Sequence, residues 1–340
     1  MEAGPTTLLE AVQYFASEEN CINYLKAMRW PDGVVVCPTC GKRGAGYLAT
    51  QKRWQCSARK LANGEAHPKR QFSIKVGTIM EDSPIGLNKW LPVLWLIANC
   101  RNGISSWEIH RDLGVTQKTA WFMLSRVRLA MQDDLTGGMM GGEVEVDESF
   151  IGGKARNMHK DRKARAMKGK RGGGDSGNKT IVMGVLERAS KGKPKRVRAT
   201  TISDRKKATM MPEIAAIVST DAKVYADEFG SNWNHLGPYD LQMVNHAAQY
   251  VDGQVHTNSL ENFWSLLKRG VGGTYIAVEP FHLFRYIDEQ AFRFNNRLHA
   301  DGEVVTDAER FSRLCAQITG KRLTYAELTG KAQERPEDAF

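Results

Sequence analysis

The stretch EVEVDESFIGG, residues 143–153, decides how the larger part of the chain folds. Acidic and apolar residues alternate along it, which is typical of a strand with one face in a core. Glu143, Glu145 and Asp147 therefore share one face, and the two valines between them share the other. A carboxylate in the middle of a strand is disfavoured unless it has a partner or a function. Asp147 is for this reason a candidate functional residue.

The segments that follow predict an alternation of strands and helices. NKTIVMGVLER and KRVRATTISD predict a hairpin, and a helix at about 205–218 precedes the strand AKVYAD, which ends in Asp227. DLQMVNHAAQY predicts a fifth strand after a short helix, and VHTNSLENFWSLLKRG, residues 255–270, predicts an amphipathic helix. This order matches a ribonuclease H-like fold of the α/β class, in which the first and fourth strands are neighbours.

Neighbouring first and fourth strands would bring Asp147 and Asp227 to one edge of the sheet. The helix at 255–270, which follows the fifth strand, would add Glu261 or Asn258. Converging carboxylates cannot all stay ionised without a cation. Oxygen ligands suit Mg²⁺ or Mn²⁺, and two such ions activate water or a hydroxyl against a phosphodiester. Taken singly, such acids are more often solvated surface groups, but their joint placement favours a metal site. Lys268, on the face of Glu261, is either a phosphate-binding cation or a solvated lysine.

Length and composition indicate a multidomain, globular protein with an anionic partner. The chain has 340 residues, 41% of them hydrophobic, and 48 Lys and Arg against 38 acids give a net charge of +10. Such a charge favours nucleic acid as partner, although it also fits many other soluble proteins. The N-terminus lacks the basic start of a signal peptide, and the longest apolar run, WLPVLWLIANC, is too short to span a membrane. We therefore expect a cytoplasmic location and no membrane partner.

Three of the six cysteines are clustered and predict a zinc site. Cys37-x-x-Cys40-Gly is half of a zinc ribbon, which needs two further ligands to complete a tetrahedron. Cys56 supplies one of them, and because CSARK contains no second cysteine, His67 is the candidate for the other. The alternatives are a metal-free remnant and a site completed by water.

Residues 83–132 predict a helix-turn-helix. Ser83, followed by proline, predicts one helix start, and a capping box of Ser105 and Glu108 predicts the next. That helix stops at Gly114, and VTQKTAWFMLSRVRLAMQ begins another. Two helices joined by a glycine-containing turn are the layout of a DNA-binding motif, although a helical hairpin inside a larger core gives the same pattern.

A basic loop at 154–171 has nine Lys and Arg and a single acid, and predicts either a phosphate-binding arm or a solvated loop. The expected DNA contacts are Gln117, Lys118, Thr119 and Arg126 in the helix-turn-helix, and Lys154, Lys170 and Arg171 in the loop.

Several motifs together resemble a known family. EVEVDESFIGGK, VYADEF and VHTNSLENFWSLLKRGVGGTY, preceded by CPTCG and GISSWEIHRDLGVTQKTAWFMLSRVRLAMQ, are similar to bacterial insertion-sequence transposases of the ISXO-type group, within the DDE superfamily. The similarity covers roughly residues 10–300 in order, and the last of the three motifs is highly specific. It implies that Asp147 and Asp227 are metal-binding aspartates.

The resemblance leaves two candidates for the third ligand. The family signature, usually written with an asparagine and a downstream lysine, maps onto Asn258 and Lys268. The spacing of the wider superfamily, an acid with a base seven residues later, maps onto Glu261 and Lys268. A carboxylate binds Mg²⁺ better than an amide does, which favours Glu261. Asn258 would then be the N-cap or a neutral ligand.

We therefore expect five segments. They are an N-terminal helix at 1–28, a zinc-ribbon-like segment at 29–80, a helix-turn-helix at 83–132, a ribonuclease H-like catalytic domain at 143–300 and a C-terminal tail at 301–340. The resemblance implies a DNA transposase at the bacterial nucleoid, which binds double-stranded terminal inverted repeats as a homodimer or higher assembly. With Mg²⁺ or Mn²⁺ it would cleave 3′ ends and join them to target DNA. The alternatives are a catalytically silent DNA-binding relic and a nuclease that only hydrolyses.

Overall fold

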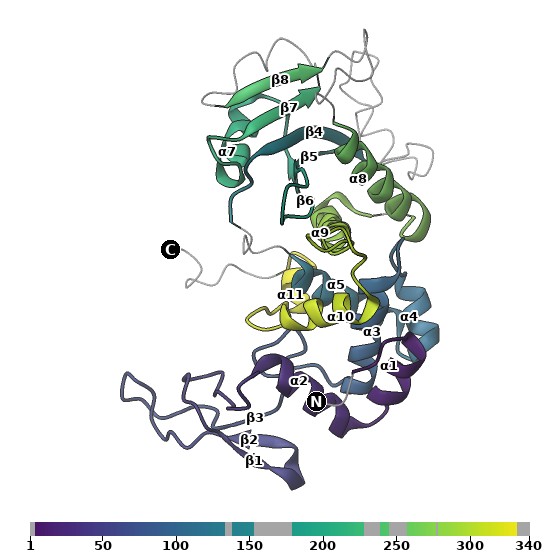
Figure 1. The fold of residues 1–340 in the computed structure, drawn as a ribbon. Coiled ribbons are helices and arrows are strands. Elements are labelled where there is room, and N and C mark those ends of the chain that lie inside the picture. Colours follow the sequence, from purple (N-terminus) through teal and green to yellow (C-terminus); the bar gives the residue numbers. More distant parts are fainter. Residues whose placement is uncertain are drawn as a thin grey trace. The chain divides into compact units, whose positions relative to one another are not determined.

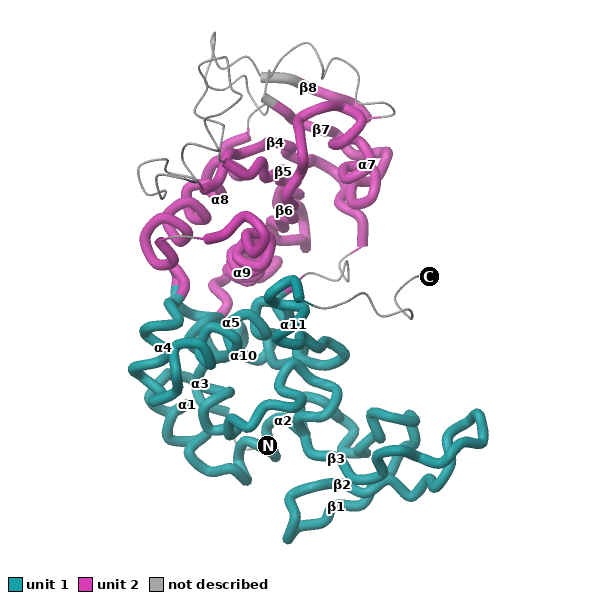
Figure 2. The backbone as a smooth tube through the Cα atoms, turned by 180° about the vertical axis from the view of Figure 1, so that it is seen from behind, with its two compact units in different colours: residues 1–100, 104–131, 306–340 teal, residues 101–103, 132–305 magenta. Residues whose placement is uncertain are grey.

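The computed structural model describes residues 4–132, 138–152, 179–227, 239–244, 257–276 and 278–331. The chain divides into two compact units, one of residues 1–100, 104–131 and 306–340, the other of residues 101–103 and 132–305 (Figure 2). Among the described residues, no helix is long and apolar enough to cross a membrane.

The second unit is built on a five-stranded sheet with the order β6-β5-β4-β7-β8. Its strands are β4 (Glu143–Ile151), β5 (Thr180–Glu187), β6 (Arg196–Ile202), β7 (Lys223–Asp227) and β8 (Asp240–Val244). β4, β5 and β6 pair antiparallel, whereas β7 runs parallel to β4 and β8 parallel to β7. The first and fourth strands of this unit are neighbours, so the predicted ribonuclease H-like sheet is confirmed.

Helices cover both faces of the sheet. Figure 1 shows α7 (Lys207–Ile217) and α8 (Asn258–Arg269) on opposite sides of it. Strand alternation explains the two cores: Val144 and Val146 pack with Ile214 of α7, while Val182 packs with Phe263 of α8 on the other face. The acidic face of β4 is the one that α8 covers.

A short helical region completes this unit. It consists of η4 (Gly270–Thr274), η5 (Pro280–His282) and α9 (Leu283–Asn295). α9 ends against β6, where the Asn295 amide accepts from Val197 N–H at 2.8 Å and donates to Val197 C=O at 2.9 Å. One side chain thus satisfies both backbone groups of an edge strand.

The first unit is mainly helical. Its helices are α1 (Leu8–Phe15), α2 (Glu18–Arg29), α3 (Leu87–Asn99), α4 (Ser106–Leu113), α5 (Gln117–Met131), α10 (Asp307–Ala316) and α11 (Tyr325–Leu328). The single helix expected at 1–28 is two helices, because Ser17 accepts Asn20 N–H and caps a new start. The start expected at Ser83 is wrong: α3 begins at Leu87, and the Ser83 hydroxyl accepts the Trp90 indole N–H at 3.1 Å.

The last segment differs from the expected tail. α10 and α11 each begin with a capping box, formed by Thr306 with Glu309 and by Thr324 with Glu327. Phe311 of α10 packs against aromatic rings of α2 and α3, and it is 1% exposed. Residues 306–328 therefore belong to the helical core of the first unit.

A small three-stranded antiparallel sheet lies in the zinc-ribbon-like segment. It contains β1 (Gly46–Leu48), β2 (Arg53–Gln55) and β3 (Gln71–Phe72), with η1 (Ala49–Gln51) between the first two. Trp54 is its core residue at 2% exposure, and it contacts the rings of Trp30, Tyr47 and Phe72. Such a core is small, so a metal site next to it would add stability.

Candidate functional site

The two aspartates singled out by the sequence lie on adjacent strands. β4 and β7 are parallel, and Val146 pairs with Ala226. Asp147 and Asp227 each follow by one residue, so they occupy neighbouring register positions at the centre of the sheet. Neighbouring strands are about 4.8 Å apart, which brings these two backbone positions within reach of one small site.

The carboxylate of Asp147 is half-buried and receives two neutral donors. Its Oδ2 accepts the indole N–H of Trp264 at 2.8 Å, and its Oδ1 accepts the backbone N–H of Glu148 at 2.8 Å. Both donors orient the carboxylate without adding a positive charge beside it. The orientation is therefore compatible with a cation as a further partner.

Glu145, two residues earlier on the same face, holds the start of α8. Its side chain is 0% exposed, and its Oε2 accepts the backbone N–H of Ser259 and of Leu260, each at 3.1 Å. Its Oε1 accepts Arg188 Nε at 2.8 Å. The N-cap Thr257 contributes no side-chain bond, so Glu145 takes over that task and places a negative charge at the positive end of the helix.

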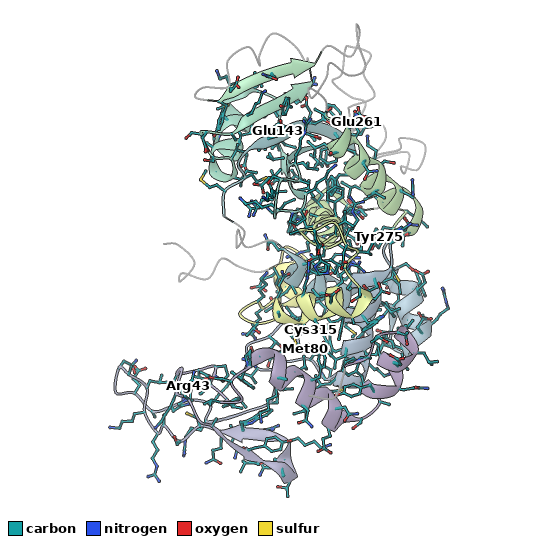
Figure 3. All side chains as sticks on the ribbon, in the orientation of Figure 1. Arg43, Met80, Glu143, Glu261, Tyr275 and Cys315 are labelled. Atoms are coloured by element: carbon teal, nitrogen blue, oxygen red, sulfur yellow. The ribbon has the colours of Figure 1, made fainter. Side chains whose placement is uncertain are left out.

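The exposed residues of α8 include Asn258, Glu261 and Lys268. Asn258 is the first helical residue and not the N-cap, which corrects that alternative. At about 100° per residue, Glu261 and Lys268 lie about 20° apart around the helix axis, and Glu261 lies about 60° from Trp264. Asn258 lies about 120° from Trp264. Glu143 on β4 and Glu261 on α8, both of the second unit, are labelled in Figure 3.

The predicted zinc ligands come together. The ligand atoms of Cys37, Cys40, Cys56 and His67 all lie within 4.8 Å of one another. Cys37 Sγ is 3.4 Å from His67 Nε2, and Cys40 Sγ is 3.6 Å from Cys56 Sγ. Tetrahedral zinc requires sulfur and nitrogen ligands about 3.5–3.8 Å apart. Three thiols and an imidazole in this arrangement fit the ion.

Local backbone structure explains how these ligands meet. Gly41 adopts a left-handed conformation, φ 72°, directly after Cys40, and its N–H donates to Cys37 C=O at 2.9 Å. The backbone N–H of His67 donates to the C=O of Arg59, which is three residues after Cys56. This hydrogen bond brings His67 close to Cys56. The Lys42 backbone N–H lowers the pKa of Cys40, whereas burial raises the pKa of Cys56. The hydrogen bond from Lys42 favours the Cys40 thiolate, the form that binds metal.

The helix-turn-helix forms as predicted, with Ser105 and Glu108 in a capping box and Gly114 in a left-handed C-cap. In the first turn of α5, only some of the side chains are available to a ligand. Gln117 is half-buried and donates to Ser106 Oγ at 2.9 Å, and the half-buried Thr119 bonds Thr116. Lys118 is exposed, with Nζ 4.5 Å from the centre of the Tyr325 ring.

The expectation that Arg126 contacts DNA is wrong. This residue is 6% exposed, and its guanidinium donates to the backbone carbonyls of Leu323, Ile79 and Glu81. Burial lowers its pKa. Arg126 therefore ties α5 to two other segments of the helical unit. The loop residues expected to bind DNA, Lys154, Lys170 and Arg171, lie outside the described residues.

The ribonuclease H-like sheet, the adjacent aspartates and the Cys/His cluster are together typical of the DDE class of transposases. Comparison with known proteins agrees. Residues 139–295 match an ISXO2-like transposase domain, and residues 16–58 match a transposase zinc-ribbon domain. The chain therefore carries an ISXO2-like transposase domain and a transposase zinc-ribbon domain.

A relative from Halobacterium salinarum is described as an uncharacterized protein in transposable element ISH50. It is 24% identical to this chain over 263 residues, which are 76% of this chain and 84% of that protein. The zinc-ribbon match ends before His67, so only the three cysteines of the cluster lie inside it.

Sequence reasoning missed two residues of this site. Glu145 was recognised as a strand residue of the acidic face, but its helix partners lie 114 and 115 residues away. Trp264 was not singled out in the sequence, and its hydrogen bond to Asp147 spans 117 residues. The signal in the sequence was the position of Glu145 in the middle of a strand. A buried carboxylate requires hydrogen-bond donors or an opposite charge, so this position indicated a partner elsewhere in the chain.

Proposed function

We propose that this transposase carries out metal-dependent cleavage and strand transfer with Asp147, Asp227 and Glu261 as its metal ligands. The neighbouring register positions of the two aspartates on β4 and β7 carry this proposal. The carboxylates fit Mg²⁺ or Mn²⁺, which prefer hard oxygen ligands. When bound, two such ions activate the attacking oxygen and stabilise the leaving oxygen of a phosphodiester.

Glu261 is preferred over Asn258 on geometric grounds. Trp264 contacts Asp147 directly, so the side of α8 near Trp264 is the side that faces this carboxylate. Glu261 lies about 60° from Trp264 around the axis, and Asn258 about twice as far. Glu261 also brings a negative charge, which an amide does not.

The remaining residues bind and orient DNA in this account. Lys268, exposed on the face of Glu261, holds a backbone phosphate as a point charge. Zinc held by Cys37, Cys40, Cys56 and His67 stabilises the ribbon, because the small sheet around Trp54 offers little other core. The ribbon and α5, through Lys118, bind the terminal repeats, and joining two ends at one target requires a dimer or higher assembly.

Cleavage of a DNA end tests the assignment of the third ligand. Duplex oligonucleotides with the element's end are incubated with Mg²⁺ and with the wild type, Glu261→Gln or Asn258→Ala. The proposal expects nicking at the end by the wild type and by Asn258→Ala, with at least a hundredfold slower nicking by Glu261→Gln, since it loses a metal-binding carboxylate. The reverse ranking would assign Asn258, and specific binding without cleavage by any of them would indicate a DNA-binding relic.

A further inference from the structure

The indole of Trp264 joins the strand and the helix that supply the proposed metal ligands. It lies on α8, is 4% exposed, and donates its only N–H to Asp147 Oδ2 at 2.8 Å. A bond between an N–H and an ionised carboxylate is stronger than one between neutral groups. This contact therefore does more than pack the helix: it sets the orientation of one carboxylate.

We propose that Trp264 is a positioning residue for Asp147, and that Gly184 is the residue that makes this position possible. The inference rests on the proposed function, because it assumes that Asp147 binds a divalent ion. Asp147 receives one donor on each oxygen, from Trp264 and from the backbone of Glu148, and these fix the plane of the carboxylate.

The choice of an indole as donor suits a site for a cation. Lysine or arginine at this position would supply a hydrogen bond but also a positive charge, which would repel the ion and compete for Asp147. An indole N–H is neutral and donates only. Removal of a residue that hydrogen-bonds to a metal ligand typically lowers the metal affinity about tenfold to a hundredfold.

Gly184 is explained by the same contact. It pairs directly with Asp147 across β4 and β5. A Cβ added at Gly184 would lie 2.7 Å from Cζ2 and 2.8 Å from Cη2 of Trp264, and 3.0 Å from Leu260 Cδ2. A glycine inside a strand weakens the strand and often marks a close approach. Here the close approach is that of the indole, which crosses β5 to reach Asp147.

The bond also couples Asp147 to Glu261. Trp264 follows Glu261 by about one turn on the same helix, so the contact that orients Asp147 also fixes the height of Glu261 relative to β4. Loss of the indole N–H is therefore expected to weaken metal binding without removing any ligand.

An NMR titration with Mg²⁺ tests this inference directly. The chain has 8 tryptophans, and the indole ¹H–¹⁵N signal of Trp264 is the one missing from Trp264→Phe. On addition of Mg²⁺ to the wild-type protein, this signal is expected to shift more than any other indole signal, because its acceptor is the proposed metal ligand Asp147. A Trp264 signal that stays in place while the protein binds Mg²⁺ would overturn the inference and leave the proposed metal site intact.

Mn²⁺ affinity, measured by calorimetry, supplies the second readout. Trp264→Phe and Gly184→Ala are each expected to bind Mn²⁺ about tenfold more weakly than the wild type. Phe263→Leu is the control for packing: this residue is buried on α8 and its ring contacts those of Trp264 and Phe294, but it donates no side-chain hydrogen bond, so its variant is expected to retain wild-type affinity. If Trp264→Phe does not fold, Gly184→Ala, which keeps the indole, gives the same comparison.

The outcomes separate the two proposals. Unchanged affinity in both variants, or an equal loss in Phe263→Leu, would refute a positioning role for Trp264. Absence of divalent-ion binding in the folded wild-type protein would instead refute the proposed function, and the inference with it.

Discussion

Replacement of Glu145 by alanine is expected to destabilise the second unit, because this carboxylate caps the N-terminus of α8. The change removes the acceptor of two backbone N–H groups and of Arg188 Nε. Removing one partner of a buried ion pair costs about 3–5 kcal/mol, and losing a helix cap costs about 1 kcal/mol. Arg188 keeps Glu143 at 3.2 Å and the Tyr225 ring at 4.2 Å, which lessens the loss. We therefore expect a decrease of about 3 kcal/mol in the free energy of unfolding.

Urea denaturation and hydrogen exchange measure this effect at two levels. The two units need not unfold together, so exchange of the peptide that contains Ser259 and Leu260 reports the local opening of α8. A decrease of about 3 kcal/mol corresponds to roughly a hundredfold faster exchange there when exchange follows the opening equilibrium. Glu213→Gln is the control, because Glu213 is exposed on α7 and its replacement is expected to change stability by less than about 0.5 kcal/mol. A change below about 1 kcal/mol in Glu145→Ala, with unaltered exchange in α8, would refute the capping role.

Further predictions concern zinc, DNA and pH. His67→Ala is expected to lower the zinc content from about one ion per chain and to speed hydrogen exchange in the ribbon, as metal analysis and mass spectrometry would show; full zinc retention would exclude His67 as a ligand. Lys118→Ala is expected to weaken binding to the end duplex and to reduce the slope of log K against log salt by about 1, which salt-dependent fluorescence anisotropy measures. Arg126→Met is instead expected to leave that slope unchanged and to lower stability by about 2 kcal/mol or more, since three backbone carbonyls lose their donor; a reduced slope would restore it as a DNA contact. Burial raises the pKa of the Cys21 thiol to about 11 from an ordinary 9.0, so the folded state binds this proton more tightly than the unfolded state. The resulting stability is present below pH 9 and is lost as the pH rises to about 11. The unfolding free energy of the wild type should therefore fall more steeply than that of Cys21→Ala in this range, by up to about 1.4 kcal/mol per pH unit, and parallel curves would contradict this.

The fold of the second unit was predictable from local patterns. Strict alternation around Asp147 determines which face of β4 is acidic, and the order of strands and helices determines that β4 and β7 are neighbours. Both are consequences of periodicity and chain connectivity, which a sequence displays directly. The Cys/His cluster was predictable for a similar reason, because few residue types bind zinc and their spacing is narrow.

Contacts between distant charged residues were not predictable in this way. Arg126 was interpreted as a surface residue since arginine is usually exposed, yet its guanidinium satisfies three carbonyls from two other segments. Nothing local distinguishes such an arginine from one that binds phosphate. The same limit applied to Glu145, whose role depends on a helix that begins more than a hundred residues later.

The C-terminal segment is a different case, because its signals were present in the sequence. Thr306 with Glu309 and Thr324 with Glu327 are capping boxes at the spacing that marks a helix start. The helices they begin are only 10 and 4 residues long, so each offers few turns over which hydrophobic periodicity is recognised. Caps and periodicity together would have predicted α10.

Strand transfer shows whether Asp147 and Asp227 carry metal-dependent catalysis. Purified protein is mixed with an oligonucleotide that carries the element's end and a free 3′-hydroxyl, a target plasmid, and either Mg²⁺ or EDTA. The same reaction is run with Asp147→Asn and Asp227→Asn, each of which replaces a carboxylate by an amide of equal size. We expect a joined product that requires Mg²⁺ and is absent from both variants, while both still bind the end. Joined product of wild-type yield in either variant, or binding without any joining by the wild type in Mg²⁺ and in Mn²⁺, would contradict this expectation.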